Sequence, residues 1–452
     1  MLVHDAFDPL RKSLKTGIRL TIPIILVYRD ALWHIVHMQP RPDLVSPDAP
    51  PGLTVFQITD TPGTPASHVY MEAQVFTPDS KSLVLHWPAH PHGCDRRDPL
   101  HRYYRCDLED GFRMTPLTDE VGAIAPSITP DGQWMYYFVV ADSRVNGGRF
   151  FLKRVRLDGS SRETVLCVDR PLPGAATIPS NLYILSTLSS DGERLATGAF
   201  LGDGNTDNAP WGLLVFDLEK ATGAVVHQSP TLLNLHPQYC RSIEPEASRD
   251  ILIQENHGGH VGPDGTTTRG TSGNGVDIHV IRDDGSLLRD IPVGRDGDEY
   301  CQGHQCWRGR TSWTITGTGI ANPRQKHGWG QELIESLPAP PAGHLGRATP
   351  GAIRNDMSRS FDIPDFRHFQ TDRDGRHLLT DCGPYDEGGR LFLASLGEPG
   401  RDPASGWTHL LDLHASNQSP AHAHPFLSPD GIRGFFNSDE TGTLQAYMVA
   451  GW

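Results

Sequence analysis

The chain has 452 residues, more than a single hydrophobic core usually supports, so we expect either several domains or repeated units side by side. Glycine (47) and proline (37) are plentiful, and turn dipeptides are spread along the whole chain, which favours an all-β protein of many short strands. The net charge is −14 and no cluster of lysines and arginines offers a footprint for phosphates, so nucleic acid is not an expected partner.

The first predicted element is the apolar run 20–28, which we expect to form a strand. It has nine residues, too few to cross a bilayer, and the start of the chain has no small-residue cleavage pattern, so we expect no membrane partner. The seven cysteines contain no CxxC pair, which indicates free thiols in a reducing compartment. Together these features predict a cytoplasmic protein.

A turn phrase of the form apolar-x-Pro-Asp-Gly recurs along the chain. Copies begin at Phe76 (FTPDS), Ile128 (ITPDG), Leu188 (LSSDG), Phe426 (FLSPDG) and, in weaker form, Thr371 (TDRDG). Proline fixes the first corner, aspartate bonds its own backbone and glycine supplies a positive φ, so each copy predicts a hairpin between two strands.

The spacing of these copies predicts the architecture. Thr77 and Thr129 are 52 residues apart, and Ser190 is 54 residues from Glu244, where IEPEAS replaces the phrase. Units of this length with four strands each are typical of β-propeller blades. Copies near 77, 129, 190, 245, 307, 372 and 428, the fifth being the degenerate QCWRGRTSWTITG, predict a seven-bladed β-propeller in one domain, 1–452. A set of β-sandwiches is the alternative, although sandwiches do not repeat one turn phrase at this interval.

One segment interrupts the repeat. Residues 321–363 are too long for a connection between blades. Long insertions in propellers lie on one face, often over the binding site. We therefore expect 321–363 to be an insertion loop over the axial face.

Two histidines near the end of the chain are candidate metal ligands. His422 and His424 alternate with alanines, so in an extended segment both rings project from one face with room around them. Such a pair can chelate a divalent ion, and Gln418 upstream could add an amide oxygen. The alternative is a pair of polar residues on a solvated strand.

Further histidines occupy comparable places in other blades. His304 precedes the fifth turn phrase as His422 and His424 precede the seventh, and equivalent positions of a propeller converge on its axis. His257 and His260 flank two glycines that would let a ligand approach the backbone. A hydrogen-bonded core histidine at 304 and a loop histidine at 257 remain the alternatives.

Polar residues also precede the turn phrases of blades one and four. Blade one has His68 and Tyr70, and blade four has His236, Gln238 and Arg241. We expect these five side chains, with His260, to contact a substrate.

With these residues in view, the chain resembles the oligogalacturonate lyase family over most of its length. The resemblance rests on SHVYMEAQVFTPDS, on GDEYCQGHQCW and on QSPAHAHPFLSPDG. It implies a seven-bladed propeller with a manganese ion held by three histidines, matching His304, His422 and His424, and by a glutamine, matching Gln418 with one extra residue of spacing. It also implies a catalytic base in the preceding blade, matching His257.

The chemistry implied is β-elimination on a small anionic oligosaccharide. Removing the C5 proton of a uronate builds negative charge beside a carboxylate, which a divalent cation offsets. A neutral imidazole can take the proton. The glycosidic oxygen at C4 then leaves, giving a 4,5-unsaturated uronate.

Three alternatives remain at this stage. The first is the same elimination on another uronate, such as glucuronate or a rhamnogalacturonan fragment. The second is a propeller that binds a partner without chemistry. The third, a hydrolase, is disfavoured because the chain contains no GxSxG motif; the nearest string, GTSGNG, departs at its last position.

Overall fold

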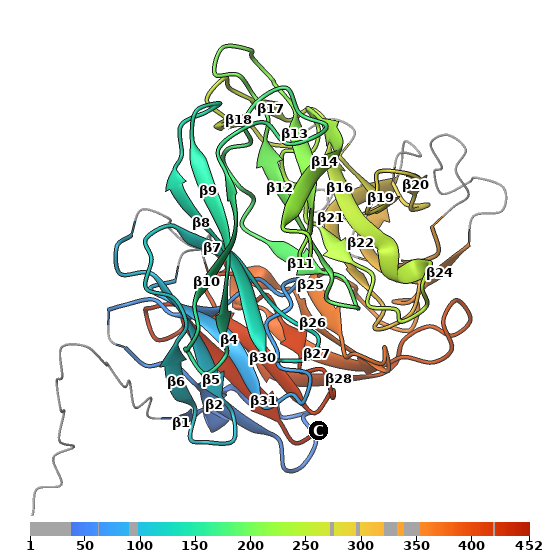
Figure 1. Cartoon of the computed structure of the whole chain (residues 1–452). Coiled ribbons are helices and arrows are strands. Elements are labelled where there is room, and N and C mark those ends of the chain that lie inside the picture. The colour runs from blue at the N-terminus through green and yellow to red at the C-terminus, as the bar shows by residue number, and fades with distance from the viewer. Residues whose placement is uncertain are drawn as a thin grey trace, which may run out of the picture. The chain divides into compact units, whose positions relative to one another are not determined.

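The computed structural model is all-β, and its strands form seven sheets in a ring, a seven-bladed β-propeller (Figure 1). The predicted fold is confirmed. The structure describes residues 38–61, 63–89, 98–271, 275–294, 299–320, 332–338, 353–418 and 421–452, with the backbone alone at Gln302 and Ile320. The predicted strand 20–28 lies outside these residues. No helix among them has the length and apolar character needed to cross a membrane.

Each blade is an antiparallel sheet whose first strand lies nearest the axis, and the first strands of several neighbouring blades contact one another. From the innermost strand outward, blades one to three are β3 (Ser67–His68), β4 (Ser82–Trp87), β5 (Arg102–Asp107) and β6 (Arg113–Pro116); β7 (Ala123–Ile128), β8 (Trp134–Asp142), β9 (Arg149–Arg156) and β10 (Glu163–Val168); and β11 (Ser186–Leu188), β12 (Arg194–Phe200), β13 (Trp211–Asp217) and β14 (Thr222–Ser229).

Blades four to six follow the same order. They are β15 (Gln238–Tyr239), β16 (Asp250–Asn256), β19 (Val276–Arg282) and β20 (Arg289–Asp290); β21 (Glu299–Trp307), β22 (Thr314–Ile320), β23 (Glu332–Ser336) and β24 (Arg354–Asp356); and β25 (Phe366–Thr371), β26 (His377–Cys382), β27 (Arg390–Ser395) and β28 (Ser405–Asp412). Outside the seven blades are the hairpin β17 (His260–Val261) and β18 (Thr267–Arg269) and the short 3-10 helices η2 (Pro42–Leu44), η3 (Ala247–Arg249) and η4 (Tyr385–Glu387).

Blade seven closes the ring with strands from both ends of the described chain. Its inner strands are β29 (Phe426–Leu427), β30 (Arg433–Ser438) and β31 (Gln445–Ala450). The outer strand β2 (Thr54–Gln57) pairs with β31, and β1 (Gln39–Pro40) extends the sheet. The first and last strands of the described chain are thereby joined by backbone hydrogen bonds within one sheet.

The turn phrases join the first two strands of a blade, as predicted. In blade two, the Asp131 carboxylate accepts hydrogen bonds from the Thr129 hydroxyl (2.5 Å) and from the backbone N–H of Gln133 (3.0 Å). Gly132 has a φ of +69°, the left-handed conformation that favours glycine. We call the face that carries these turns the lower face, and the face where the innermost strands begin the upper face.

A short stretch of blade one, residues 70–75, crosses toward the blades on the other side of the axis; we call it the axial segment. Gln74 donates from Nε2 to the Leu188 carbonyl (2.8 Å) and accepts the Leu188 N–H (2.5 Å), which ties it to blade three. The Gln74 carbonyl accepts from the N–H of Ile128 in blade two (2.7 Å), and Met71 accepts from Gln370 of blade six (3.2 Å). The axial segment therefore connects blades that share no strand pairing.

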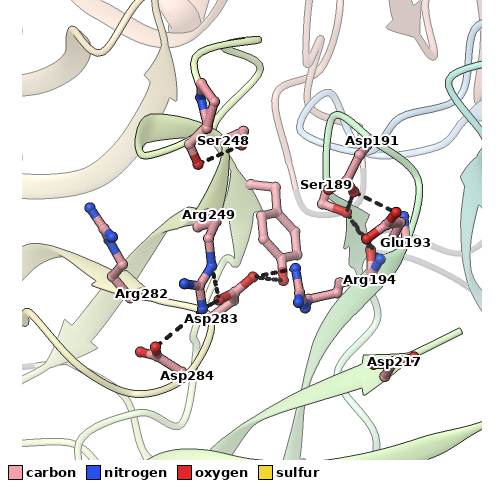
Figure 2. Close-up of polar contacts among 12 residues, drawn as sticks. Ser189, Asp191, Glu193, Arg194, Asp217, Ser248, Arg249, Arg282, Asp283 and Asp284 are labelled. Atoms are coloured by element: carbon pink, nitrogen blue, oxygen red, sulfur yellow. Dashed lines mark hydrogen bonds and ion pairs between the residues drawn. The ribbon is translucent and has the colours of Figure 1, made fainter. Parts of the chain in front are cut away.

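An ion-pair network on the lower face holds blades three and four together (Figure 2). The Asp283 carboxylate, whose side chain is 1% exposed, lies 2.6 Å from Arg249 and 3.4 Å from Arg194 of blade three. The Tyr239 hydroxyl donates to it as well (3.4 Å). The buried carboxylate of Asp283 thus has two guanidinium partners and a hydroxyl donor, in keeping with the rule that buried charges are paired.

The expectation that 321–363 is one long loop is corrected by the fold. β23 and β24 lie within this segment and complete blade five, so Glu332–Ser336 and Arg354–Asp356 are strands rather than connection. Residues 321–331 and 339–352 lie outside the described part of the chain. The six cysteines described are free thiols, as expected.

We predict that Gln74→Ala lowers the free energy of unfolding by about 1–3 kcal/mol, because it leaves the buried backbone groups of Leu188 unsatisfied. Urea denaturation measures the change. The matched control is Gln133→Ala in an exposed turn. Equal stability of the two variants would show that the axial segment contributes nothing to the ring.

Candidate metal centre and active site

Four imidazole rings from three neighbouring blades meet near the axis on the upper side. His304 lies on β21 and His368 on β25, while His422 and His424 precede β29. Between ring centroids, His368 lies 4.6 Å from His304. It lies 5.5 Å from His422 and 4.4 Å from His424. The structure thus brings the three predicted histidine ligands together around a fourth, His368.

The nitrogen atoms of this cluster suit one ion. One nitrogen from each of His368, His422 and His424 lies within 4.8 Å of the other two. Burial, followed by the charges of neighbouring histidines, holds the pKa of His304 well below its usual value. The ring is therefore neutral at pH 7, the form in which imidazole binds metals.

A buried carboxylate orients His368. Asp381 of β26 accepts hydrogen bonds from Nδ1 of His368 (2.9 Å) and from its backbone N–H (2.7 Å). A carboxylate on Nδ1 leaves Nε2 as the electron-pair donor, an arrangement typical of metal-bound histidine. Burial acts to raise the pKa of Asp381, but the charge and hydrogen bonds of His368 outweigh it and hold that pKa below its usual value. The donors and their support fit a divalent ion such as Mn²⁺.

Sequence reasoning missed His368, although a signal was present. His368 lies three residues before the weak turn phrase that begins at Thr371, just as His304 lies three residues before Trp307. Comparing the same strand position in every blade would have found it. Asp381 gave no such signal, because it reaches His368 from the neighbouring strand of the sheet.

Tyr70 and His236 border the histidine cluster. The Tyr70 ring lies 4.6 Å from that of His424 and 5.5 Å from that of His236. His236 Nδ1 lies 2.8 Å from Oε2 of Glu72, whose side chain is 1% exposed. Burial raises the pKa of Glu72, and the charge of His236 opposes this rise. Tyr70 and His236 therefore lie beside the cluster, where a bound ligand could touch them.

His257 and His260 lie in blade four and its hairpin. His257 follows β16, and its Nε2 lies 2.8 Å from Oδ2 of Asp277 on β19. Because β16 runs antiparallel to β15, it ends on the upper face, the face of the axial histidines. His260 lies on β17 and contacts Asp207 (3.0 Å) and Thr268 (2.7 Å). His257 therefore has the carboxylate partner that orients a general base, and His260 is held by exposed groups.

Gln418 and His68 are not members of the four-histidine cluster, and they differ from each other in burial. Gln418 is exposed, and its backbone carbonyl accepts the N–H of Ala421 (2.5 Å). His68 is 2% exposed, its ring lies 4.6 Å from Phe426, and its Nδ1 bonds the Val69 carbonyl (2.7 Å). Burial lowers the pKa of His68 to about 4. His68 also interacts with the backbone of Ala423, between His422 and His424, so it packs where blades one and seven meet, against the backbone of the cluster.

Gln238 and Arg241 lie on the other side of the axial segment from the histidines. Both line a cavity of about 220 Å³ that also includes Met71 and Ala73 of that segment and the turn residue Pro429. Gln238 donates to the carbonyl of Gln305 in blade five (2.9 Å). Burial lowers the pKa of Arg241 to about 10. The structure therefore separates these two residues from the others predicted to contact one substrate.

No protein-family model matches the chain, and no curated protein matches it by sequence. Solved structures do. An oligogalacturonate lyase in complex with manganese is 18% identical and aligns over 92% of this chain and 97% of its own, with a TM-score of 0.60. The oligogalacturonate lyase of Vibrio parahaemolyticus is also 18% identical over the same shares, with a TM-score of 0.62. The likeness is one of fold, and the chain has the seven-bladed propeller of these solved lyases.

Proposed function

We propose that the protein is a metal-dependent lyase that cleaves uronate-containing oligosaccharides by β-elimination. The observation that carries the proposal is the convergence of His304, His368, His422 and His424, with Asp381 behind His368. A divalent ion held there supplies what a uronate carboxylate needs when it loses its neighbouring proton. The fold shared with solved oligogalacturonate lyases supports the same conclusion.

In this proposal the four histidines hold the ion, and Gln418 or a water molecule completes its ligands. When bound, the cation neutralises charge that develops on the substrate carboxylate. It would also let an acidic protein attract an anionic sugar.

His257 is the proposed base. In this proposal its Nε2 donates to Asp277 and its Nδ1 accepts the C5 proton. Electrons of the C5–H bond then form the C4–C5 double bond as the glycosidic oxygen leaves C4. Tyr70, His236 and His260 are the proposed substrate contacts. Cytoplasmic location, for which the free thiols are one argument, is part of the proposal.

The experiment that tests the function is the ultraviolet absorbance of the 4,5-unsaturated product. Purified protein with added Mn²⁺ is incubated with oligomers of galacturonate, of glucuronate and with rhamnogalacturonan fragments. We expect absorbance to rise with at least one oligomer, galacturonate first. Absorbance that stays flat with every uronate, while the oligomers still bind, would favour the binding propeller.

We predict that the double substitution His422→Ala, His424→Ala removes about one divalent ion per chain, because it deletes two of the four imidazole donors. Elemental analysis of the folded protein measures the loss. The control is His409→Ala on β28, an outer strand of blade six. Unchanged metal content in the double variant would contradict the assignment.

A second prediction concerns the support of His368. Asp381→Asn should weaken binding of the axial ion by about 10- to 100-fold, because an amide neither fixes the tautomer nor raises the basicity of the ring. Competition with a chelator measures the affinity. The matched control is Asp412→Asn on β28. Equal affinities would mean that the carboxylate serves only to satisfy a buried histidine.

A third prediction separates base from ligand. His257→Ala should keep the axial ion and the affinity for substrate while turnover falls by about 10²- to 10⁴-fold. Turnover of the wild type should rise with pH and then level off, since only the neutral ring accepts a proton. His260→Ala and Arg241→Ala are compared at saturating Mn²⁺. If either of them abolishes turnover while His257→Ala does not, the base is reassigned.

A further inference from the structure

A second group of potential ligands lies in blade four, on one face of its sheet. Glu255 of β16 pairs directly with Asp277 of β19, and Ile253 pairs with His279. Because side chains two residues apart share a face, Glu255, Asp277 and His279 all project to the same side. None of these three belongs to the axial cluster.

The distances within this group match those of ligands on one ion. One ligand atom from each of Glu255, Asp277 and His279 lies within 4.8 Å of the other two. Nε2 of His279 lies 3.4 Å from Oε2 of Glu255. Atoms about 2.0–2.2 Å from a tetrahedral ion lie about 3.3–3.6 Å apart, so this pair has ligand spacing and is long for a charge-assisted hydrogen bond.

His279 carries the outer partner expected of a metal ligand. Its Nδ1 lies 2.7 Å from Oδ1 of Asp290 on β20. With Nδ1–H donated to that carboxylate, Nε2 becomes the electron-pair donor and faces Glu255. The same relation, with Asp381 in place of Asp290, holds for His368 of the axial cluster.

Burial and charge favour a cation at this place. The side chains of Asp277 and His279 are 3% and 8% exposed, while Glu255 at 19% leaves a path to solvent. Three carboxylates, those of Glu255, Asp277 and Asp290, are gathered around His279, and buried carboxylates repel one another unless a cation lies between them.

We propose that Glu255, Asp277 and His279 form a second divalent-metal site, with Asp290 orienting His279. Imidazole and carboxylate donors suit Zn²⁺ and Mn²⁺. Through the bond between Asp277 and His257, an ion there would lie next to the proposed base. The site nevertheless stands on its own donors and does not require the proposed function.

The test is a metal titration of the full chain after removal of metal by a chelator. Zn²⁺ is added to the wild type, to Glu255→Gln, to His279→Ala and to the axial variant His422→Ala, His424→Ala, and bound metal is measured by elemental analysis. We expect about two ions per chain in the wild type, about one in each variant, and none when Glu255→Gln is combined with the axial substitutions. Co²⁺, followed by its visible absorption, gives a readout that is independent of activity.

The controls separate the possible failures. Glu193→Gln, in an exposed turn, should bind as the wild type does. Glu255→Gln removes the charge but keeps the size of the side chain. It can therefore be used to test the site if His279→Ala does not fold. Unchanged stoichiometry in both blade four variants would overturn the proposal and leave an ion-pair network. One ion in the wild type that only the blade four variants lose would support this site and contradict the axial one.

Discussion

Closure of the ring by the pairing of β2 with β31 is the constraint on which the rest of the structure depends. Each blade alone is a twisted four-stranded sheet with two exposed faces, and only its neighbours bury them. When the last sheet is completed, every innermost strand is fixed at the axis. Rings from blades five, six and seven can then meet within a few ångströms of one another, although the residues are far apart in the chain. The candidate metal centre therefore depends on closure of the propeller ring.

The axial segment lies between the candidate metal centre and the cavity on the lower face. Tyr70 and Glu72 face the histidine cluster, whereas Met71 and Ala73 line the cavity of the lower face. The backbone of the segment is bonded to other blades, so it is held as part of the ring. The histidine cluster and the lower cavity therefore lie on opposite sides of the axial segment.

Much of the fold and part of the site were predictable from sequence because their signals lie in short, local stretches of the chain. The turn phrases are local, since Asp131 and Gly132 shape a turn with their immediate neighbours, and their spacing indicates seven blades. His422 and His424 could be identified as candidate ligands because they alternate with alanines in the sequence. The outer strands of blade five were mistaken for a loop because the segment that contains them, 321–363, is too long for a connection between blades.

The partners of the site residues could not be predicted in the same way. Asp381 and Asp277 act on histidines through the register of neighbouring strands, which no local pattern encodes. Arg241 shares a blade edge with His236 but lies below the axial segment, because the crossing of that segment depends on contacts with several other blades. Three-dimensional position, rather than residue type, decides which predicted residues can share a ligand.

The composite sheet of blade seven also sets an order of events during synthesis. β2 leaves the ribosome nearly 400 residues before its partner β31, so for most of translation its edge is open to pairing with other strands. Pairing strands from the two ends of the chain closes a very long chain loop, and pairings between residues so far apart in sequence form late in folding. The imidazoles of His422 and His424 emerge with this last sheet, so the proposed axial ion could bind its full set of histidines only at the final step of folding.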